Sequence, residues 1–203
     1  SMHSRARILD VKIEKLKEEI SNGVVPVITG FQGMNDEGDI TTLGRGGSDT
    51  TGVALAVALG ASECQIYTDV DGVLTADPRL YDKARLLKKV TFEEMLELSS
   101  MGAKVLQLRA VEYASKYQMP IRVLSSFKAG EGTLIDEEDE SMERPIVSGI
   151  SSIDSEAKLT LRGVPDIPGV AAKILGPISE AGIEIDVIVQ NISAENTTDF
   201  TFT

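Results

Sequence analysis

The sequence predicts an α/β fold, a parallel sheet covered by helices, followed by a smaller βαββ unit. Short apolar runs of strand length alternate with longer amphipathic stretches up to about residue 135, and the alternation resumes on a smaller scale after an acidic stretch. The hydrophobic share of 42%, with 26% charged residues, is that of a globular chain and indicates neither disorder nor a fibrous repeat.

The first two predicted elements lie ahead of a glycine-rich segment. Apolar side chains spaced among Lys and Glu predict an amphipathic surface helix over 11–20, which Asn22-Gly23 ends. The continuous apolar run VVPVIT, 24–29, has the length of a strand and precedes a glycine-punctuated loop, so it predicts a buried strand.

The segment TTLGRGGSDTTGVALAVALGA, 41–61, contains the next predicted helix. We expect that helix to run from Asp49 to Leu59, with the Ser48 hydroxyl as its N-cap and Gly60 in the left-handed position that ends it. The remaining elements of this part are two strands, CQIYT (64–68) and PIRVLSS (120–126), and two helices, 92–100 and 104–117.

An acidic linker is predicted at DEEDESMERP, 136–145, which is nearly free of apolar residues and closed by a proline. It separates a larger part, 1–135, from a smaller part, 146–203. The smaller part is predicted to form a strand, a helix and two strands over AKLTLRGV (157–164), PGVAAKILGPISEAG (168–182), IEIDVIVQN (183–191) and TTDFTFT (197–203). Because the sequence stops on a strand, this unit is expected to be incomplete.

Composition excludes several classes of function. The net charge of −12 argues against nucleic acid and anionic membranes as partners, since both require clustered Lys and Arg. The single cysteine and the lack of an apolar run near the roughly 20 residues that span a bilayer indicate a reducing, cytoplasmic compartment. With one histidine and one cysteine, hydrolysis, zinc chemistry and thiol redox chemistry lack their usual groups. Phosphoryl transfer suits the chain better, because positioning and charge neutralisation carry most of its catalysis.

The glycine-rich segment is the first candidate site. Unpaired amides and the positive end of the dipole attract anions to a helix N-terminus, and Gly46-Gly47 would let a ligand approach the backbone closely. Arg45 adds a planar fork of donors suited to a carboxylate or a phosphate. A tight loop with a capped helix explains the same residues, and that alternative stays open. No Lys-Ser or Lys-Thr follows the glycines, which excludes an ordinary P-loop.

Two further candidates follow along the chain. In YTDVDGVLTADPR, 67–79, Asp69 and Asp71 could face a ribose or its metal ion and Arg79 a phosphate, although structural turns use Asp-Gly and Asp-Pro as well. Lys104 follows Gly102-Ala103 at a predicted helix start, where its ammonium group could meet phosphates. A solvated surface lysine is the alternative.

Taken together, the motifs resemble a known family. VPVITGFQG, TTLGRGGSDTT, YTDVDGVLTADPR, EEMLELSSMGAKVL and GTLI resemble, in order and spacing, the C-terminal half of the catalytic domain of the aspartokinases, which belong to the amino acid kinase family. GVPDIPGVAAKI and IEIDVIVQN resemble the first ACT domain of those enzymes. The resemblance implies part of an amino-acid-kinase-type α/β/α sandwich, followed by an incomplete ferredoxin-like ACT unit.

The same resemblance implies an activity. Aspartokinases phosphorylate the β-carboxylate of L-aspartate with ATP and Mg²⁺, giving 4-phospho-L-aspartate, the first step toward lysine, threonine and methionine. Their ACT domains bind the feedback amino acid, here lysine, threonine or both. We expect a homo-oligomer, because ACT sheets pair side by side.

Site residues are implied position by position. The substrate-binding positions fall on Arg45, Gly46, Gly47 and Ser48, and Asp49 matches the acidic residue that organises phosphoryl transfer. The nucleotide-binding positions fall on Thr68, Asp69, Leu74, Arg79, Lys104 and Val105. The effector-binding positions fall on Asp166, Ile167, Pro168, Gly169, Val170, Ala171, Glu184, Ile185, Asp186 and Gln190. No metal ligand is implied.

The sequence departs from the family pattern in four ways. Leu74 stands where many relatives have tyrosine, and Gln107-Leu108 replaces a His-Pro pair. A KFGGTS-like segment, which supplies a lysine to the phosphates, does not occur, and neither does a second ACT unit. We therefore expect this chain alone to be inactive. Two alternatives remain: a non-catalytic amino-acid-binding regulatory subunit, and another amino acid kinase acting on glutamate, carbamate or a nucleotide.

Overall fold

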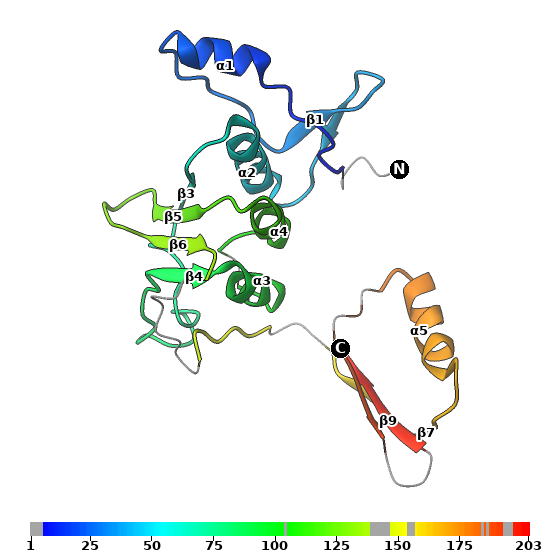
Figure 1. Cartoon of the computed structure of the whole chain (residues 1–203). Coiled ribbons are helices and arrows are strands. Elements are labelled where there is room, and N and C mark those ends of the chain that lie inside the picture. Colours follow the sequence, from blue (N-terminus) through cyan, green and yellow to red (C-terminus); the bar gives the residue numbers. More distant parts are fainter. Residues whose placement is uncertain are drawn as a thin grey trace. The chain divides into compact units, whose positions relative to one another are not determined.

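The structure, a computed structural model, describes residues 6–103, 105–138, 147–153, 157–183, 185, 187–192 and 197–203. The chain divides into two compact units, Ser1–Ser152 and Ile153–Thr203, which are described one at a time (Figure 1). The predicted linker, 136–145, lies before that division, and its residues 139–145 fall outside the described part.

A four-stranded sheet forms the centre of the first unit, with the strand order β3-β5-β6-β4. β3 (Cys64–Thr68) runs parallel to β5 (Ile121–Ser125), and β4 (Lys89–Thr91) runs parallel to β6 (Thr133–Asp136). β5 and β6 are antiparallel to each other, so the sheet is mixed rather than wholly parallel. The predicted α/β class is confirmed, and the strands CQIYT and PIRVLSS lie where the sequence predicts them.

Three helices cover one face of this sheet: α2 (Gly47–Leu59), α4 (Leu108–Tyr117) and α3 (Phe92–Ser100) (Figure 1). Their apolar sides and the strands form one core whose largest fully buried side chains include Val53, Met95, Val111, Ile121, Val123 and Ile135. The third helix begins at a capping box. The Thr91 hydroxyl accepts from the Glu94 amide at 3.1 Å, and the Glu94 carboxylate accepts from the Thr91 amide at 2.9 Å.

Two predicted helices begin later than the sequence suggests. α1 covers Glu14–Ser21 instead of 11–20, and Gly23, with φ of +80°, follows its end. The helix predicted over 104–117 begins at Leu108, because Gln107 has an extended backbone with ψ of 133° and interrupts the helical path. Ahead of it, the Leu106 side chain is buried in the core.

The predicted buried strand over 24–29 is wrong for this structure. The segment has no regular secondary structure, and the side chains of Val25 and Val27 are 85% and 98% exposed. A continuous apolar run is buried only where strands pair with it and layers cover both of its faces. Within the described ranges no strand pairs with this segment. The sequence also misses the hairpin that follows, β1 (Gln32–Met34) with β2 (Ile40–Thr42).

The last described segment of the first unit, 147–152, is hydrogen-bonded to residues earlier in that unit. The Ser148 hydroxyl donates to the Glu94 carboxylate, and the Ile150 amide donates to the Thr75 carbonyl at 2.9 Å. Burial by itself raises the pKa of Glu94, but the hydrogen bonds from Ser148 and Thr91 outweigh it and lower that pKa. The chain is therefore attached to α3 and to the loop after β3 just before it leaves the unit.

The second unit has the predicted order of strand, helix, strand, strand. β7 (Leu159–Pro165), β8 (Ile188–Ile192) and β9 (Thr197–Phe202) form an antiparallel sheet with β9 in the middle, and α5 covers Val170–Glu180. Thr198, Phe200 and Phe202 are buried on one side of the central strand. In neither unit is any described helix long and apolar enough to cross a membrane.

Candidate functional site

The glycine-rich segment forms the N-terminus of α2, but not as the sequence predicts. The helix begins at Gly47 with Gly46 as its N-cap, so Ser48 lies in the first turn and does not cap it. Gly46 has a left-handed backbone with φ of +69°, which glycine adopts without a steric penalty, and this starts the helix two residues early. The predicted C-terminal end is confirmed, since Gly60 is also left-handed, with φ of +67°.

The two glycines are packed against the protein's own side chains. A Cβ atom on Gly46 would lie 1.6 Å from Cγ of Gln107, and one on Gly47 would lie 2.9 Å from Cβ of Leu43. On the side where a Cβ atom would lie, the two glycines are thus covered by neighbouring residues. These contacts fix the loop against the start of α4 and leave the side chains of Arg45 and Ser48 exposed.

Asp49 lies half-buried in the first turn of the same helix. Burial raises the pKa of its carboxyl group, and a hydrogen bond with the backbone of Gln107 partly opposes that rise. A carboxylate with a perturbed pKa beside an exposed arginine and hydroxyl, at a helix N-terminus, is typical of a functional site. The structure therefore brings Arg45, Ser48 and Asp49 together on one short segment.

Phe31 is a residue of this site that the sequence analysis missed. It has a left-handed backbone, with φ of +72°, which is rare for a bulky side chain. Its amide donates to the Thr51 hydroxyl at 3.2 Å and its carbonyl accepts from the Leu43 amide at 2.9 Å, so α2 and the loop before it impose this conformation. Such strain collects at functional sites. No signal in the sequence marks a positive φ at a phenylalanine.

Two of the predicted nucleotide residues, Thr68 and Asp69, lie at the C-terminal end of β3. Thr68 is its last residue and is paired in register with Ser125 of the parallel strand β5; its hydroxyl donates to the Asp69 carboxylate at 3.1 Å. Ligands of α/β sheets bind beyond the carboxyl ends of the strands, which is where this pair lies. Val105 lies at the bend before α4, and Lys104 falls outside the described residues.

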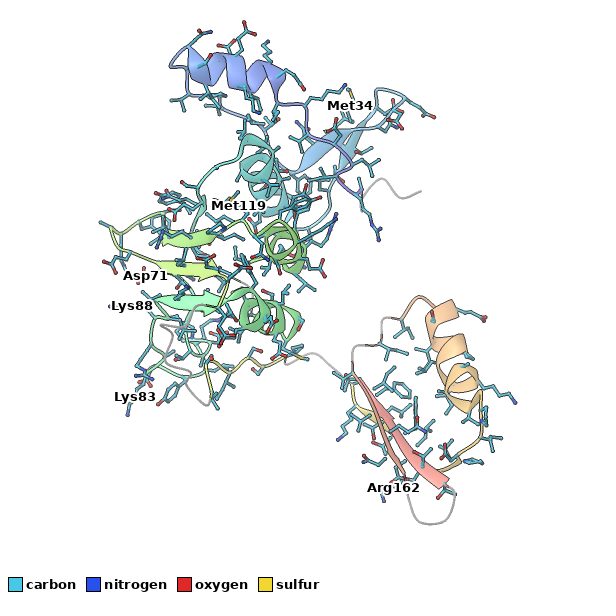
Figure 2. All side chains as sticks on the ribbon, in the orientation of Figure 1. Met34, Asp71, Lys83, Lys88, Met119 and Arg162 are labelled. Atoms are coloured by element: carbon cyan, nitrogen blue, oxygen red, sulfur yellow. The ribbon has the colours of Figure 1, made fainter. Side chains whose placement is uncertain are left out.

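The loop after β3 carries the other predicted nucleotide residues. Leu74 forms a bridge with Leu86, across the loop. Arg79 is exposed and binds Asp77 through two nitrogens, at 3.0 and 2.7 Å, so a phosphate would have to compete with this carboxylate. Asp71, labelled in Figure 2, forms an ion pair with Lys128 at 3.0 Å.

A separate cavity of about 320 Å³ lies in the second unit. Its lining includes predicted effector residues from both C-terminal motifs: Asp166, Ile167, Pro168, Gly169, Val170, Ala171 and Gln190. The other lining residues are Val164, Pro165, Thr198 and Phe200. The structure thus joins the loop before α5 to strand β8. Ile185 is half-buried and is not among the lining residues, while Glu184 and Asp186 lie outside the described part of the chain.

Comparisons with known proteins identify relatives of this chain. The model of the amino acid kinase family matches residues 2–125. Over the whole chain, 65% of residues are identical to an aspartate kinase from Pseudomonas fluorescens, of which the chain covers 49%. Two solved structures of Escherichia coli aspartokinase III, one with aspartate and ADP and one with lysine and aspartate, each have a TM-score of 0.68 and 30% identity. They match 93% of this chain, which covers 41% and 42% of them. The chain therefore spans about half the length of the curated relatives it matches.

Proposed function

The chain belongs to the amino acid kinase family, and we propose that it is part of an aspartate kinase. That enzyme would transfer the γ-phosphoryl group of ATP to the β-carboxylate of L-aspartate. The observation that supports L-aspartate as the substrate is the 65% identity to an aspartate kinase along the full chain. The geometry at the start of α2 supports it, because Arg45 and Ser48 present donors to a substrate carboxylate.

The reaction needs positioning and charge neutralisation rather than a protein nucleophile. A β-carboxylate oxygen of aspartate attacks the γ-phosphorus, the new O–P bond forms, and the bond to ADP breaks. We propose that Arg45, Ser48 and the backbone at Gly46 and Gly47 hold aspartate, while Asp49 organises the site around the transferred group. Asp49 does not act as a nucleophile in this scheme.

ATP is proposed to bind beyond β3, on Thr68, Asp69, Leu74, Arg79, Lys104 and Val105. The described residues contain no cluster of three or more His, Cys, Asp or Glu that could hold a metal ion. We therefore propose that Mg²⁺ arrives on the ATP phosphates, as it commonly does in kinases. The solved aspartokinase III in complex with aspartate and ADP supports the binding of a nucleotide beside the substrate.

The test is L-aspartate-dependent ADP release from Mg-ATP by the full-length protein that contains this chain. We expect turnover with L-aspartate and none with L-glutamate, carbamate or UMP as the acceptor. Turnover with one of the other acceptors alone would identify another amino acid kinase. Amino-acid binding without any turnover would identify a regulatory subunit. The isolated chain, assayed in parallel, tests the expectation that it is inactive alone.

We also propose that the cavity of the second unit binds the feedback amino acid, lysine, threonine or both. The loop before α5 lines the cavity and leads into a helix N-terminus, which favours an α-carboxylate, and the exposed Asp166 carboxylate suits an α-ammonium group. The aspartokinase III structure with lysine supports an amino-acid effector. β7 and β8 are the outer strands of the described sheet, and we propose that the protein self-associates through this unit.

Asp166→Ala is expected to weaken the binding of the effector about tenfold or more, because the ammonium group loses its charged partner. Isothermal titration calorimetry with lysine and with threonine measures the change. Glu180→Ala, which removes an exposed carboxylate at the end of α5 outside the cavity lining, is the matched control. Equal affinities in the Asp166 variant and the control would contradict the proposed site.

A further inference from the structure

The loop between β3 and β4, residues 69–88, contains three of the proposed ATP-binding residues but has little regular structure of its own. Its two arms pair with each other. The Leu87 amide donates to the Val73 carbonyl at 2.9 Å, and the Thr75 amide donates to the Arg85 carbonyl at 2.9 Å. This pairing makes the loop a small hairpin, but it does not fix that hairpin to the sheet.

Thr133, the first residue of β6, provides a connection to the sheet. Its side chain is completely buried, and its hydroxyl accepts from the Val73 amide at 2.9 Å. The same hydroxyl donates to the Leu87 carbonyl at 2.6 Å. One side chain therefore binds both arms of the loop, 60 and 46 residues away in the sequence.

The backbone around Thr133 is shaped to allow this bridge. Gly72 has φ of +146°, and a Cβ atom there would lie 2.5 Å from Oγ1 of Thr133. Gly132 has φ of +62°, and a Cβ atom there would lie 2.0 Å from the Val123 carbonyl oxygen. Glycine on each side lets the loop and the sheet approach within the reach of one hydroxyl.

We propose that Thr133 is a positioning residue for ATP, which acts through the loop and does not touch the nucleotide. This inference rests on the proposed kinase function. A valine in its place would leave the buried Val73 amide and the half-buried Leu87 carbonyl without this partner, and the buried amide recovers a partner only when the backbone moves. The arm that carries Asp69, Leu74 and Arg79 would then lose its hydrogen bond to β6 and keep only weaker attachments, among them the exposed Asp71–Lys128 ion pair.

The experiment compares Thr133→Val, which keeps the volume, with Thr133→Ser, which keeps the hydroxyl. Hydrogen exchange of this chain measures the loop directly. We expect faster exchange at residues 69–79 in the valine variant and recovery of most of the protection in the serine variant. Unchanged exchange in the valine variant would overturn the proposal, whatever the reaction of the enzyme.

Steady-state kinetics of the full-length protein give the second measurement. We expect Thr133→Val to raise the KM for ATP about tenfold, equivalent to about 1.4 kcal/mol, with the KM for aspartate changed less than twofold and with recovery in Thr133→Ser. Val111→Ala, a buried change in α4 outside this loop, controls for general destabilisation. If both KM values rise together, or the control reproduces the effect, Thr133 is merely structural and the proposal fails. If the wild-type protein shows no ATP-dependent turnover, the proposed function fails instead, and the exchange result still stands.

Discussion

Asp49→Asn in the full-length kinase is expected to lower kcat by about two to three orders of magnitude, the usual cost of removing one group that organises charge in a transition state. Asparagine keeps the size of the side chain and an oxygen that can still accept the hydrogen bond from Gln107. The change therefore removes the charge with little other disturbance. Initial rates at saturating aspartate and ATP measure it.

Two controls separate this effect from a loss of folding. Asp36→Asn replaces an exposed carboxylate in the turn of the β1–β2 hairpin and is expected to leave kcat unchanged. Because burial raises the folded-state pKa of Asp49 above its unfolded value, its ionisation at neutral pH opposes folding. Asp49→Asn should thus keep or raise the free energy of unfolding. A kcat within threefold of wild type would contradict the role given to Asp49.

The raised pKa also predicts the acid side of the pH profile. If the ionised carboxylate supports turnover, activity falls as the pH falls through the raised pKa of Asp49, at a higher pH than for an ordinary aspartate. The asparagine variant should lose this limb of the profile.

Gly132→Ala is expected to destabilise the first unit by about 3 kcal/mol or more, since it combines backbone strain with a steric clash. The new Cβ would lie 2.0 Å from a carbonyl oxygen of β5, and this oxygen cannot move without disturbing the β5–β6 pairing. Urea denaturation of the chain, monitored by circular dichroism, measures the free energy of unfolding.

Gly60→Ala is the matched control for that prediction. Gly60 has nearly the same backbone, with φ of +67° against +62°, but a Cβ atom there meets nothing within 4 Å. Gly60→Ala should lower the free energy of unfolding only by the cost of a left-handed backbone at alanine, about 1 kcal/mol. Equal losses in the two variants would show that the clash at Gly132 is relieved by relaxation.

The elements that the sequence predicted well carry their signal locally. β3 and α3 have the predicted bounds, because β3 is a short apolar run and α3 follows directly on its capping residue, Thr91. The strand prediction for 24–29 was wrong because an apolar run shows only that a segment could form a buried strand. Whether it is buried depends on neighbours elsewhere in the chain. Ser48 failed as an N-cap because the left-handed conformation of Gly46 competed with a side-chain signal that is only statistical.

The candidate site divides in the same way. Arg45, Ser48 and Asp49 lie on one short segment, so one motif predicts them together. Phe31, Gln107 and Thr133 act through backbone strain, a close contact and a bridge across 60 residues, none of which has a local sequence signal. Only the tertiary arrangement shows what these residues do.

The exposed valines of the segment 24–29 also affect the tendency of copies of this chain to associate in solution. Val25 and Val27 present apolar surface that water solvates poorly and that a second molecule can cover. The net charge of −12 opposes such encounters by mutual repulsion between molecules. Added salt shortens the range of that repulsion, to about 10 Å at 0.1 M and about 3 Å at 1 M, but leaves the apolar attraction in place. In dilute buffer the charge repulsion is therefore expected to keep copies of the chain apart, and in concentrated salt the apolar attraction is expected to bring them together.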